Sequence, residues 1–275
     1  MSETFTYCLN TSTISGQKLS LVEEINIAAK AGYRGIEPWI REIVAYRDGG
    51  GSLADLRKRL SDHGLAVPSA IGFAEWIVDD EQQRRRGLEE ARRDMELLAS
   101  IGGTGIAAPP AGARDVTNLD LLAAAKRYAE VIDVGREFAV IPLVEFWGFA
   151  QSLHTLGEAA LIAIESAQPE ASILADVYHL YRGGSTHETL HLLGGAIRVL
   201  HMNDYPARPR QSLTDTDRVW PGDGDAPIRQ ILHNLRRGGF TGAVSLELFN
   251  ESYWKMDALE AARIGLEKMR QACEM

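Results

Sequence analysis

The feature of the sequence that most limits its fold is the regular alternation of short apolar segments with longer segments of helical period. Eight short segments are rich in apolar and β-branched residues, and after each one apolar residues recur every three or four positions. The predicted strands span residues 5–10, 34–39, 66–71, 105–109, 140–146, 172–177, 198–202 and 243–249. The predicted helices span residues 19–31, 52–63, 81–101, 118–137, 154–167, 185–193, 227–238 and 256–271. This alternation is typical of a parallel sheet covered by helices.

Eight strand–helix units without a break in composition favour one closed barrel over two domains. We therefore predict an α/β fold, a (β/α)8 TIM barrel, in which residues 1–275 form a single domain. A doubly wound open sheet is the alternative. The expected helix N-caps are Ser20, Ser52 and Asn118, and the expected left-handed helix ends are Gly32, Gly64, Gly102 and Gly238. Both folds bind ligands beyond the carboxyl ends of the strands, so residues at those ends are the first candidates for a site.

Charge and composition exclude several classes of function. The 29 Lys and Arg residues stand against 38 Asp and Glu residues, and the resulting charge of -9 disfavours a nucleic-acid partner. The chain has no apolar stretch of membrane-spanning length, and its first ten residues lack the features of a secretion signal, so we expect a cytoplasmic protein. Cys8 and Cys273 are the only cysteines, which excludes a disulfide scaffold and a cysteine-based zinc site.

The last four predicted strands each carry a metal-binding side chain near the carboxyl end. These residues are Glu145, Asp176, His201 and Glu247. Adjacent strands lie about 5 Å apart, so the four side chains can converge on one point. A lone buried carboxylate is unfavourable, whereas one that binds a cation is compensated. We predict one divalent metal ion, with Mn²⁺, Mg²⁺, Co²⁺ and Zn²⁺ all compatible with three oxygen donors and one imidazole. The alternative is that Glu145 and Glu247 are buried partners of Arg or Lys.

Such a metal site favours proton transfer beside a carbonyl group. A cation that binds a ketone oxygen and a neighbouring hydroxyl stabilises the negative charge of an enediolate. Glu145 and Glu247 come from different sides of the predicted barrel, so one could remove the proton from carbon and the other return it. We predict these two residues as the catalytic pair of an isomerase or epimerase that acts on a small keto-polyol.

Other residues near the strand ends are candidates for substrate binding. They are His179, Asn10, Glu37, Trp39 and Trp76, together with Asp204, Arg208, Arg218 and Trp220 in the long connection 203–227. Amides, aromatic faces and charged groups at a barrel mouth suit a polyhydroxylated ligand. The connection is expected to cover the substrate, because long loops in compact domains are usually functional. Each residue also has a structural alternative: His179 could begin a helix, Trp76 could pack in the core, and each candidate in the connection could only hold it in place.

The segment HETLH, residues 187–191, matches the H-E-x-x-H pattern of zinc proteases. In that pattern two histidines on one helix face bind zinc and the glutamate is the general base. The position of the third histidine in the extended motif is occupied by Ile197, and no glutamate occurs between Glu188 and Glu247. Glycine pairs on both sides favour a short outer helix. A zinc protease is therefore a remote alternative.

The four ligand candidates and the spacing of Asp176 and His179 resemble those of the xylose isomerase-like TIM barrel superfamily. LTDTDRVWPGDG at 213–224, GFTGAVSLELFNESYWKMDALEA from Gly239, YCLNTSTI near the start and GYRGIEPW around Glu37 resemble the inosose isomerases of inositol catabolism. The resemblance covers essentially the whole chain. It implies one divalent cation on the four ligand candidates, with the two glutamates as acid and base.

The resemblance also defines the alternatives. Related barrels include dehydroshikimate dehydratases and enzymes that cleave 3-keto-glycosides, so a lyase that eliminates a substituent after the same first step is the second hypothesis. A binding protein without turnover is the third, and a homo-oligomer could form. In the ketose epimerases an arginine follows the metal histidine at a fixed offset, where this chain has Ala207. The endonuclease IV relatives need further histidines and a basic face that this sequence lacks.

Overall fold

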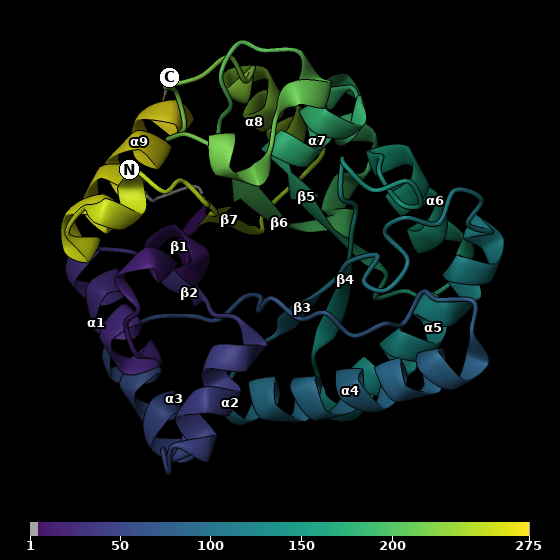
Figure 1. Cartoon of the computed structure of the whole chain (residues 1–275), viewed down its shortest axis with the longest axis horizontal. Coiled ribbons are helices and arrows are strands. Elements are labelled where there is room, and N and C mark those ends of the chain that lie inside the picture. Colours follow the sequence, from purple (N-terminus) through teal and green to yellow (C-terminus); the bar gives the residue numbers. More distant parts are fainter. Residues whose placement is uncertain (1–4, 275) are drawn as a thin grey trace.

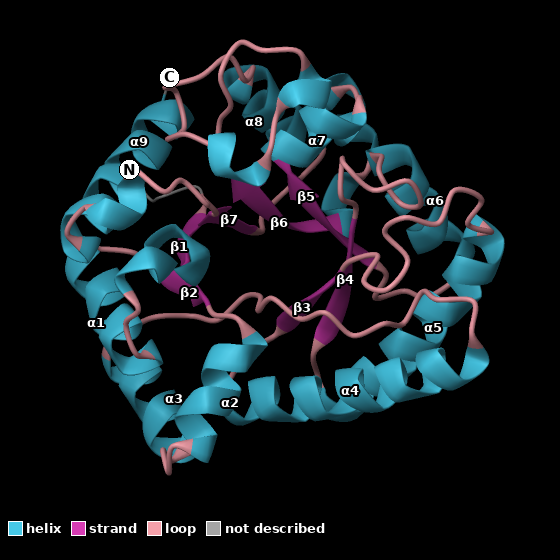
Figure 2. Ribbon diagram, in the orientation of Figure 1, coloured by secondary structure: helices cyan, strands magenta, loops and turns pink. Residues whose placement is uncertain are grey.

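The computed structural model describes residues 5–274, so residues 1–4 and 275 of the predicted domain lie outside the described part. Within it the chain forms a curled, parallel, seven-stranded sheet surrounded by helices (Figures 1 and 2). The strands are β1 Thr6–Asn10, β2 Gly35–Glu37, β3 Gly105–Ala108, β4 Ile141–Glu145, β5 Ser172–Asp176, β6 Ile197–Met202 and β7 Ala243–Leu246. Their order around the sheet is β2-β1-β7-β6-β5-β4-β3.

The predicted strand at residues 66–71 occupies the eighth position of the barrel without being a regular strand. Ala66 bridges Gly35 of β2, and Ile71 bridges Trp39 just beyond that strand. On its other side the Ala70 N–H donates to the Gly105 carbonyl over 3.0 Å and the Ala107 N–H donates to the Ala70 carbonyl over 2.9 Å. Pro68 lies in the middle of the segment and has no N–H to donate, which interrupts the ladder. The segment nevertheless links β2 to β3 and closes the TIM barrel, as predicted.

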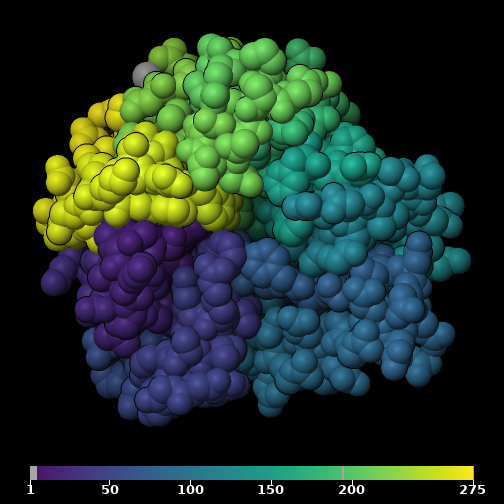
Figure 3. All heavy atoms as spheres, in the orientation of Figure 1, coloured from purple at the N-terminus to yellow at the C-terminus, as the bar shows by residue number. Residues whose placement is uncertain are grey.

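Nine helices cover the sheet in the described part of the chain. They are α1 Leu21–Ala31, α2 Ile40–Asp48, α3 Leu53–Asp62, α4 Glu81–Ser100, α5 Leu121–Phe138, α6 Leu156–Glu165, α7 Val177–Gly183, α8 Ile228–Arg237 and α9 Ala258–Glu274. Ser20 caps α1 in a reciprocal capping box with Glu23, and Gly32 ends that helix at φ 100°. The first and last helices pack side by side, so the two ends of the chain meet in the closed barrel (Figure 3).

Local predictions differ from the structure in four places. Helix α2 was not predicted. The predicted helix at 185–193 is a 3₁₀ helix, His187–Leu192, and the helix that follows β5 is α7. Asp120 caps α5 instead of Asn118, because its side chain accepts from the N–H groups of the first turn. Gly238 has a right-handed conformation at φ -79°, and the left-handed residue is Gly239 at φ 82°.

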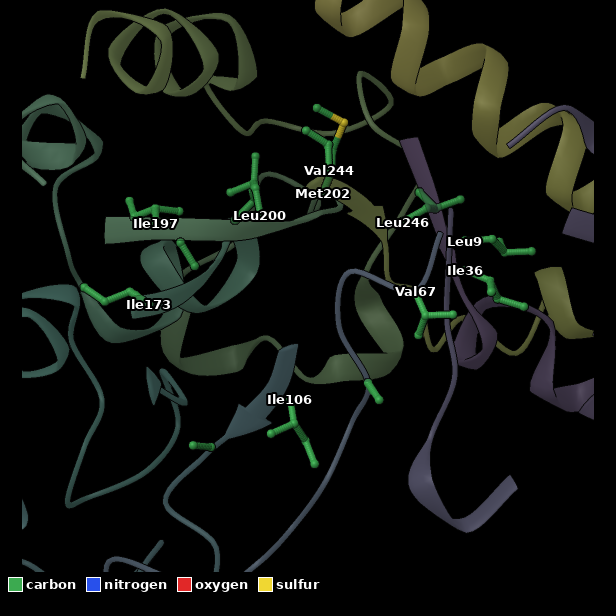
Figure 4. Packing of buried hydrophobic residues seen from close by; sticks show 14 of the residues in the cluster. Leu9, Ile36, Val67, Ile106, Ile173, Ile197, Leu200, Met202, Val244 and Leu246 are labelled. Carbon is green, nitrogen blue, oxygen red and sulfur yellow. The ribbon is translucent and has the colours of Figure 1, made fainter. Parts of the chain in front are cut away.

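The hydrophobic core lies mainly between the strands and the helices. Outward-facing strand residues fill this layer, among them Leu9, Ile36, Ile106, Ile173, Leu200 and Leu246 (Figure 4). A second, smaller cluster contains the inward-facing residues Cys8, Ile71, Ala107, Leu143, Leu174, Val199 and Ala243. The barrel interior is therefore a packed apolar plug, to which the β1 residue Cys8 belongs. Within residues 5–274, no helix combines the length and apolar character that crossing a bilayer requires.

Candidate active site

The pleat of the strands explains why the candidate residues meet. Alternate side chains of a strand point to the same face, so residues two positions beyond the apolar plug also point into the barrel. This relation places Asn10 after Cys8, Glu145 after Leu143, Asp176 after Leu174, His201 after Val199, and Ser245 and Glu247 after Ala243. The polar layer thus lies directly above the apolar plug, at the carboxyl end of the barrel. Along each of these strands the inward-facing residues change from apolar to polar at this level, and the polar residues form the site.

Asp176, His201 and Glu247 form the centre of this layer. One ligating atom from each of them lies within 4.8 Å of the others. His201 Nδ1 is 3.1 Å from Glu247 Oε2 and 3.7 Å from Asp176 Oδ2. Both ring nitrogens of this fully buried histidine lack a hydrogen bond of acceptable geometry within residues 5–274. A buried imidazole nitrogen that faces two carboxylates fits a divalent cation, so the donor set agrees with three of the four predicted ligands.

Glu37 contacts His201 at Nε2, whereas Asp176 and Glu247 face the other ring nitrogen, Nδ1. Glu37 Oε2 lies 3.0 Å from His201 Nε2 and accepts hydrogen bonds from Asn10 Nδ2 over 2.8 Å and from Ser245 Oγ over 2.7 Å. Burial opposes charge on both groups, yet His201 keeps the pKa of Glu37 below its usual range. The carboxylates of Glu247 and Glu37 likewise keep the pKa of His201 well above its usual range. Glu37 and Asn10, predicted to bind substrate, are completely buried. They orient the histidine, and Asn10 also donates to Glu247 over 3.2 Å.

Arg218 reaches the centre from the connection 203–227. Its Nη1 donates to Asp176 Oδ2 over 2.9 Å and to Glu247 Oε2 over 2.7 Å, and its Nη2 donates to Asp215 Oδ1 over 2.7 Å. Burial raises the pKa of a carboxyl group, but the guanidinium overrides this and holds the pKa of Asp176 far below its usual range. Glu247 therefore has the arginine partner that was the structural alternative to metal binding. The two roles are compatible, because a carboxylate oxygen can accept from more than one partner.

Glu145 differs from the other three residues. It lines a cavity of about 410 Å³ together with Glu247, His179 and Arg218, but its oxygens do not belong to the group of three ligating atoms. Its carboxylate has no hydrogen bond or ion pair with residues 5–274. Burial raises the pKa of Glu145 to about 8, with His201 opposing the shift and Glu247 adding to it. The Glu145 carboxylate therefore lies beside the centre without a partner among the described residues.

His179 lies in the first turn of α7 and lines the same cavity. Its backbone N–H donates to Asp176 Oδ1 over 2.8 Å, and the Gly148 N–H donates to its Nδ1 over 3.2 Å. Burial lowers the pKa of the imidazole, so the ring is neutral at pH 7. Arg218 Nη2 also lies 3.4 Å from His179 Nε2, so both ring nitrogens face N–H donors.

Two predicted substrate contacts are placed elsewhere. Trp76 is 1% exposed, donates from Nε1 to the Pro109 carbonyl over 3.0 Å and packs on Tyr128, so it belongs to the core. Asp204 accepts hydrogen bonds from the N–H groups of Gly222, Gly224 and Ala226 over 2.9, 3.0 and 2.8 Å. Its carboxylate holds the connection 203–227 together and does not line the cavity. Both residues have the structural role that was their alternative.

Two further candidates in the connection 203–227, Trp220 and Arg208, also have structural roles. Trp220 stacks on Tyr253 with a centroid distance of 4.1 Å, and Arg208 pairs with Asp217 at the surface. The connection nonetheless lies over the cavity, because Asp215, Thr216 and Arg218 all line it. Its predicted position above the site is therefore confirmed, although most of its candidate residues do not contact the site.

The HETLH segment has no metal geometry. It lies in a 3₁₀ helix, where residues four positions apart point in different directions because each turn has three residues. His191 Nδ1 instead lies 2.6 Å from the Glu188 carbonyl oxygen. Among the described residues, the cluster of Asp176, His201 and Glu247 is the group that satisfies the criteria for a metal site, and it contains neither histidine. The zinc protease alternative is therefore not supported.

Several cavity residues were not predicted from the sequence. They are aromatic or rim residues: Phe73, Arg114, Trp147, Phe149, Asp215, Phe249 and Trp254. Most of the rings come directly after a strand or the bridging segment, as Trp147 and Phe149 follow Glu145 in EFWGF. Asn203 was also missed. It donates to Asp176 Oδ2 over 3.1 Å and lies two residues after His201, so the alternation along β6 could have identified it.

Comparisons with known proteins agree with this architecture. The family model described as Xylose isomerase-like TIM barrel matches residues 25–272. The inosose isomerase of Bacillus velezensis is 27% identical over 268 residues, which cover 94% of each chain. The 3-dehydroshikimate dehydratase of Pseudomonas aeruginosa is 25% identical over 253 residues, which are 88% of this chain and 38% of that protein. The crystal structure of the IOLI protein with a bound zinc atom superposes with a TM-score of 0.89 and 24% identity, covering 98% of each chain.

Proposed function

We propose, from the premise that the chain belongs to the xylose isomerase-like TIM barrel family, that it is a divalent-metal-dependent isomerase of a keto-cyclitol. The observation that carries the proposal is the convergence of Asp176, His201 and Glu247 beside the unpaired carboxylate of Glu145 in one cavity. The similarity to inosose isomerase along 94% of both chains supports the substrate class. An isomerase or epimerase of a keto-sugar would use the same residues.

The three converging residues would hold the cation, and Glu37 would orient the histidine that binds it. A bound divalent cation would draw electrons from a substrate carbonyl and make the neighbouring C–H bond acidic. Zinc is one candidate, because the similar IOLI structure contains it, and manganese is another that the donor set accepts. The fourth predicted ligand, Glu145, stays a prediction.

The proposed reaction moves a carbonyl group to the neighbouring carbon. One of Glu145 and Glu247 takes the proton from the hydroxyl-bearing carbon, and the other delivers a proton to the former carbonyl carbon. The hydroxyl proton passes to the other oxygen, so no atom is gained or lost. His179 lines the same cavity and would contact a substrate oxygen.

The cellular setting follows from the same proposal. The substrate class points to a cytoplasmic enzyme of inositol catabolism, working on a small keto-polyol. The homo-oligomer and the absence of a nucleic-acid partner stay predictions. The non-catalytic binding protein is disfavoured, because both proposed acid–base carboxylates line the cavity.

Hydrogen exchange tests the proposed activity directly. The protein loaded with Zn²⁺ or Mn²⁺ is incubated with 2-keto-myo-inositol in D₂O, and loss of the proton signals beside the carbonyl is followed by NMR after removal of the metal. We expect deuterium to enter the carbon next to the ketone and 1-keto-D-chiro-inositol to form. The proposal would be contradicted if no exchange occurred with the Zn²⁺-loaded protein and none with the Mn²⁺-loaded protein. Glu188→Gln, which removes a carboxylate of the HETLH segment, is the matched control and should exchange normally.

The second candidate is a lyase that eliminates a substituent after the same proton abstraction. The 25% identity to a 3-dehydroshikimate dehydratase favours keeping it. The same NMR experiment with 3-dehydroshikimate would show loss of water and formation of an aromatic product. We expect the isomerisation to dominate, because the inosose isomerase similarity covers nearly all of both chains, whereas the dehydratase match covers 38% of that protein.

A further inference from the structure

A closed collar of aromatic rings surrounds the mouth of the cavity. Its members are Phe249, Trp39, Phe73, Trp147, Phe149 and His179, in the order of their contacts. Successive centroids are 6.3, 5.2, 6.3, 5.6 and 5.4 Å apart. Arg218 completes the circle, because its guanidinium lies 5.1 Å from the Phe249 ring and its Nη2 lies 3.4 Å from His179 Nε2. The rings come from five separate segments at the carboxyl end of the barrel.

The collar is larger and more exposed than one polyol ring requires. A keto-polyol that reaches Glu145 and Glu247 can stack on one or two neighbouring rings, but it cannot cover a circle of six. Phe73 is 40% exposed although it is a large apolar side chain. Its position between Trp39 and Trp147 leaves apolar surface on the outer side of the collar, away from the carboxylates. Exposed aromatic surface continuous with a binding cavity is typical of a further ligand contact.

A second cavity begins on the outer side of this wall. It has a volume of about 330 Å³, shares Trp39, Ile71 and Phe73 with the first cavity, and runs between α2 and α4. Arg41, Glu90 and Asp94 line its other parts, and the Arg41 guanidinium lies 3.9 Å from the Trp39 ring centroid. Trp39, Ile71 and Phe73 therefore separate the cavity of the acid–base pair from a groove that has an aromatic side and polar groups further out.

We propose that the site also accepts a keto-polyol that carries an aromatic ring, and that Phe73 and Trp147 bind this second ring. The proposal rests on the proposed function, because the keto-polyol ring occupies the cavity of Glu145 and Glu247. The aromatic substituent lies against the exposed face of the collar and points to the groove between α2 and α4. Aromatic pairs stabilise each other beyond simple burial, which gives the site a preference for a ring over an aliphatic group of similar size.

Two stable glycosides test the second ring without a reaction. Phenyl β-D-glucopyranoside and methyl β-D-glucopyranoside share the polyol ring and differ in the substituent. Their dissociation constants for the zinc-loaded protein are measured by ligand-observed NMR. We expect the phenyl compound to bind at least tenfold more tightly. In Phe73→Ala the ratio of the two constants should fall below threefold, whereas Phe73→Trp should keep it near the wild-type value.

The ratio of the two constants is the readout, so a general loss of binding cancels. Leu192→Ala is the control, because Leu192 is 72% exposed and lies outside both cavities, and it should leave the ratio unchanged. Equal binding of the two glycosides by the wild type, or a phenyl preference that survives in Phe73→Ala, would overturn the inference. Deuterium exchange of unsubstituted 2-keto-myo-inositol tests the proposed function separately. Deuterium exchange without a phenyl preference would contradict only the inference about the aromatic ring. A phenyl preference without exchange would contradict only the proposed isomerase activity.

Discussion

At the scale of single residues, the site depends on which carboxylates face the cavity and which stand behind it. Glu37 is fully buried and contacts His201 Nε2, whereas Glu145 opens into the cavity without a partner among residues 5–274. Partners that orient a metal ligand typically contribute a factor of about 10 to 100 in metal affinity. Replacement of Glu37 should therefore lower metal affinity, whereas replacement of Glu145 should lower the rate of proton transfer.

Replacing Glu37 should weaken metal binding and leave the acid–base pair, Glu145 and Glu247, intact. Glu37→Gln keeps the shape of the side chain but removes the charge that stabilises the His201 ring. We expect the dissociation constant for Zn²⁺ to rise about 10- to 100-fold, measured by competition with a chelating dye. Exchange activity should recover when the metal is raised to saturation. Unchanged zinc affinity would show that Glu37 does not orient a metal ligand.

Replacing Glu145 should abolish proton transfer. Glu145→Gln removes the group that accepts or donates the proton, and general acid–base catalysis contributes about 10²- to 10⁴-fold. We expect deuterium exchange of 2-keto-myo-inositol to fall by at least about 100-fold, with an unchanged far-ultraviolet circular dichroism spectrum. Zinc affinity, measured on the same variant, shows whether Glu145 also acts as the fourth ligand. Wild-type exchange rates in this variant would contradict its catalytic role.

At the scale of elements, the sequence predicts strands and helices well where pattern and local chemistry agree. The helices α1, α4 and α6 were predicted within about two residues from their apolar periodicity. In the structure a Ser, Asp or Thr caps the first turn of each. The segment 66–71 was predicted as a strand, but Pro68 prevents a regular ladder. The segment 185–193 was predicted as a helix, but its glycine pairs leave room for little more than a 3₁₀ turn.

Helix α1 contains a buried carboxyl group that should make stability depend on pH. Glu24 is 2% exposed and its Oε2 has no hydrogen-bond partner in the described chain. Burial, with repulsion from Glu42, raises its pKa to about 9. The folded state therefore keeps the proton longer than the unfolded state, whose carboxyl ionises near pH 4.3. The resulting stability is complete below that pH and is lost as pH rises towards about 9.

Glu24→Gln should remove this loss of folding stability at high pH. We expect the variant to be more stable than the wild type at pH 8, by at least about 1 kcal/mol, and to differ much less at pH 4.5. Urea unfolding at the two pH values measures the difference. Glu89→Gln, at an exposed position of α4, is the control and should change neither value. A constant difference between the two pH values would contradict the raised pKa.

At the scale of the whole molecule, the closed barrel brings together residues that are far apart in the sequence. The positions of Asp176, His201 and Glu247 near the carboxyl ends of neighbouring strands predicted that they would converge, and the geometry shows this convergence. Sequence reasoning could not separate Glu37 from a substrate contact, because burial behind His201 depends on the pairing of β1 with both β2 and β7. The aromatic collar was missed for a similar reason, since its rings share a surface only after the barrel closes.

Because the three converging residues come from β5, β6 and the end of β7, a cation that binds them should stabilise the barrel as a whole. A ligand that binds only the folded state, at about 100 times its dissociation constant, adds about 2.7 kcal/mol. For a chain of this size that corresponds to a rise in Tm of roughly 5 to 10 °C. We expect this rise with Zn²⁺ by scanning calorimetry, and its reversal by a chelator. His201→Ala should lose the shift, whereas Glu188→Gln should keep it. An equal shift in His201→Ala would place the cation elsewhere and remove the physical basis of the proposed isomerase.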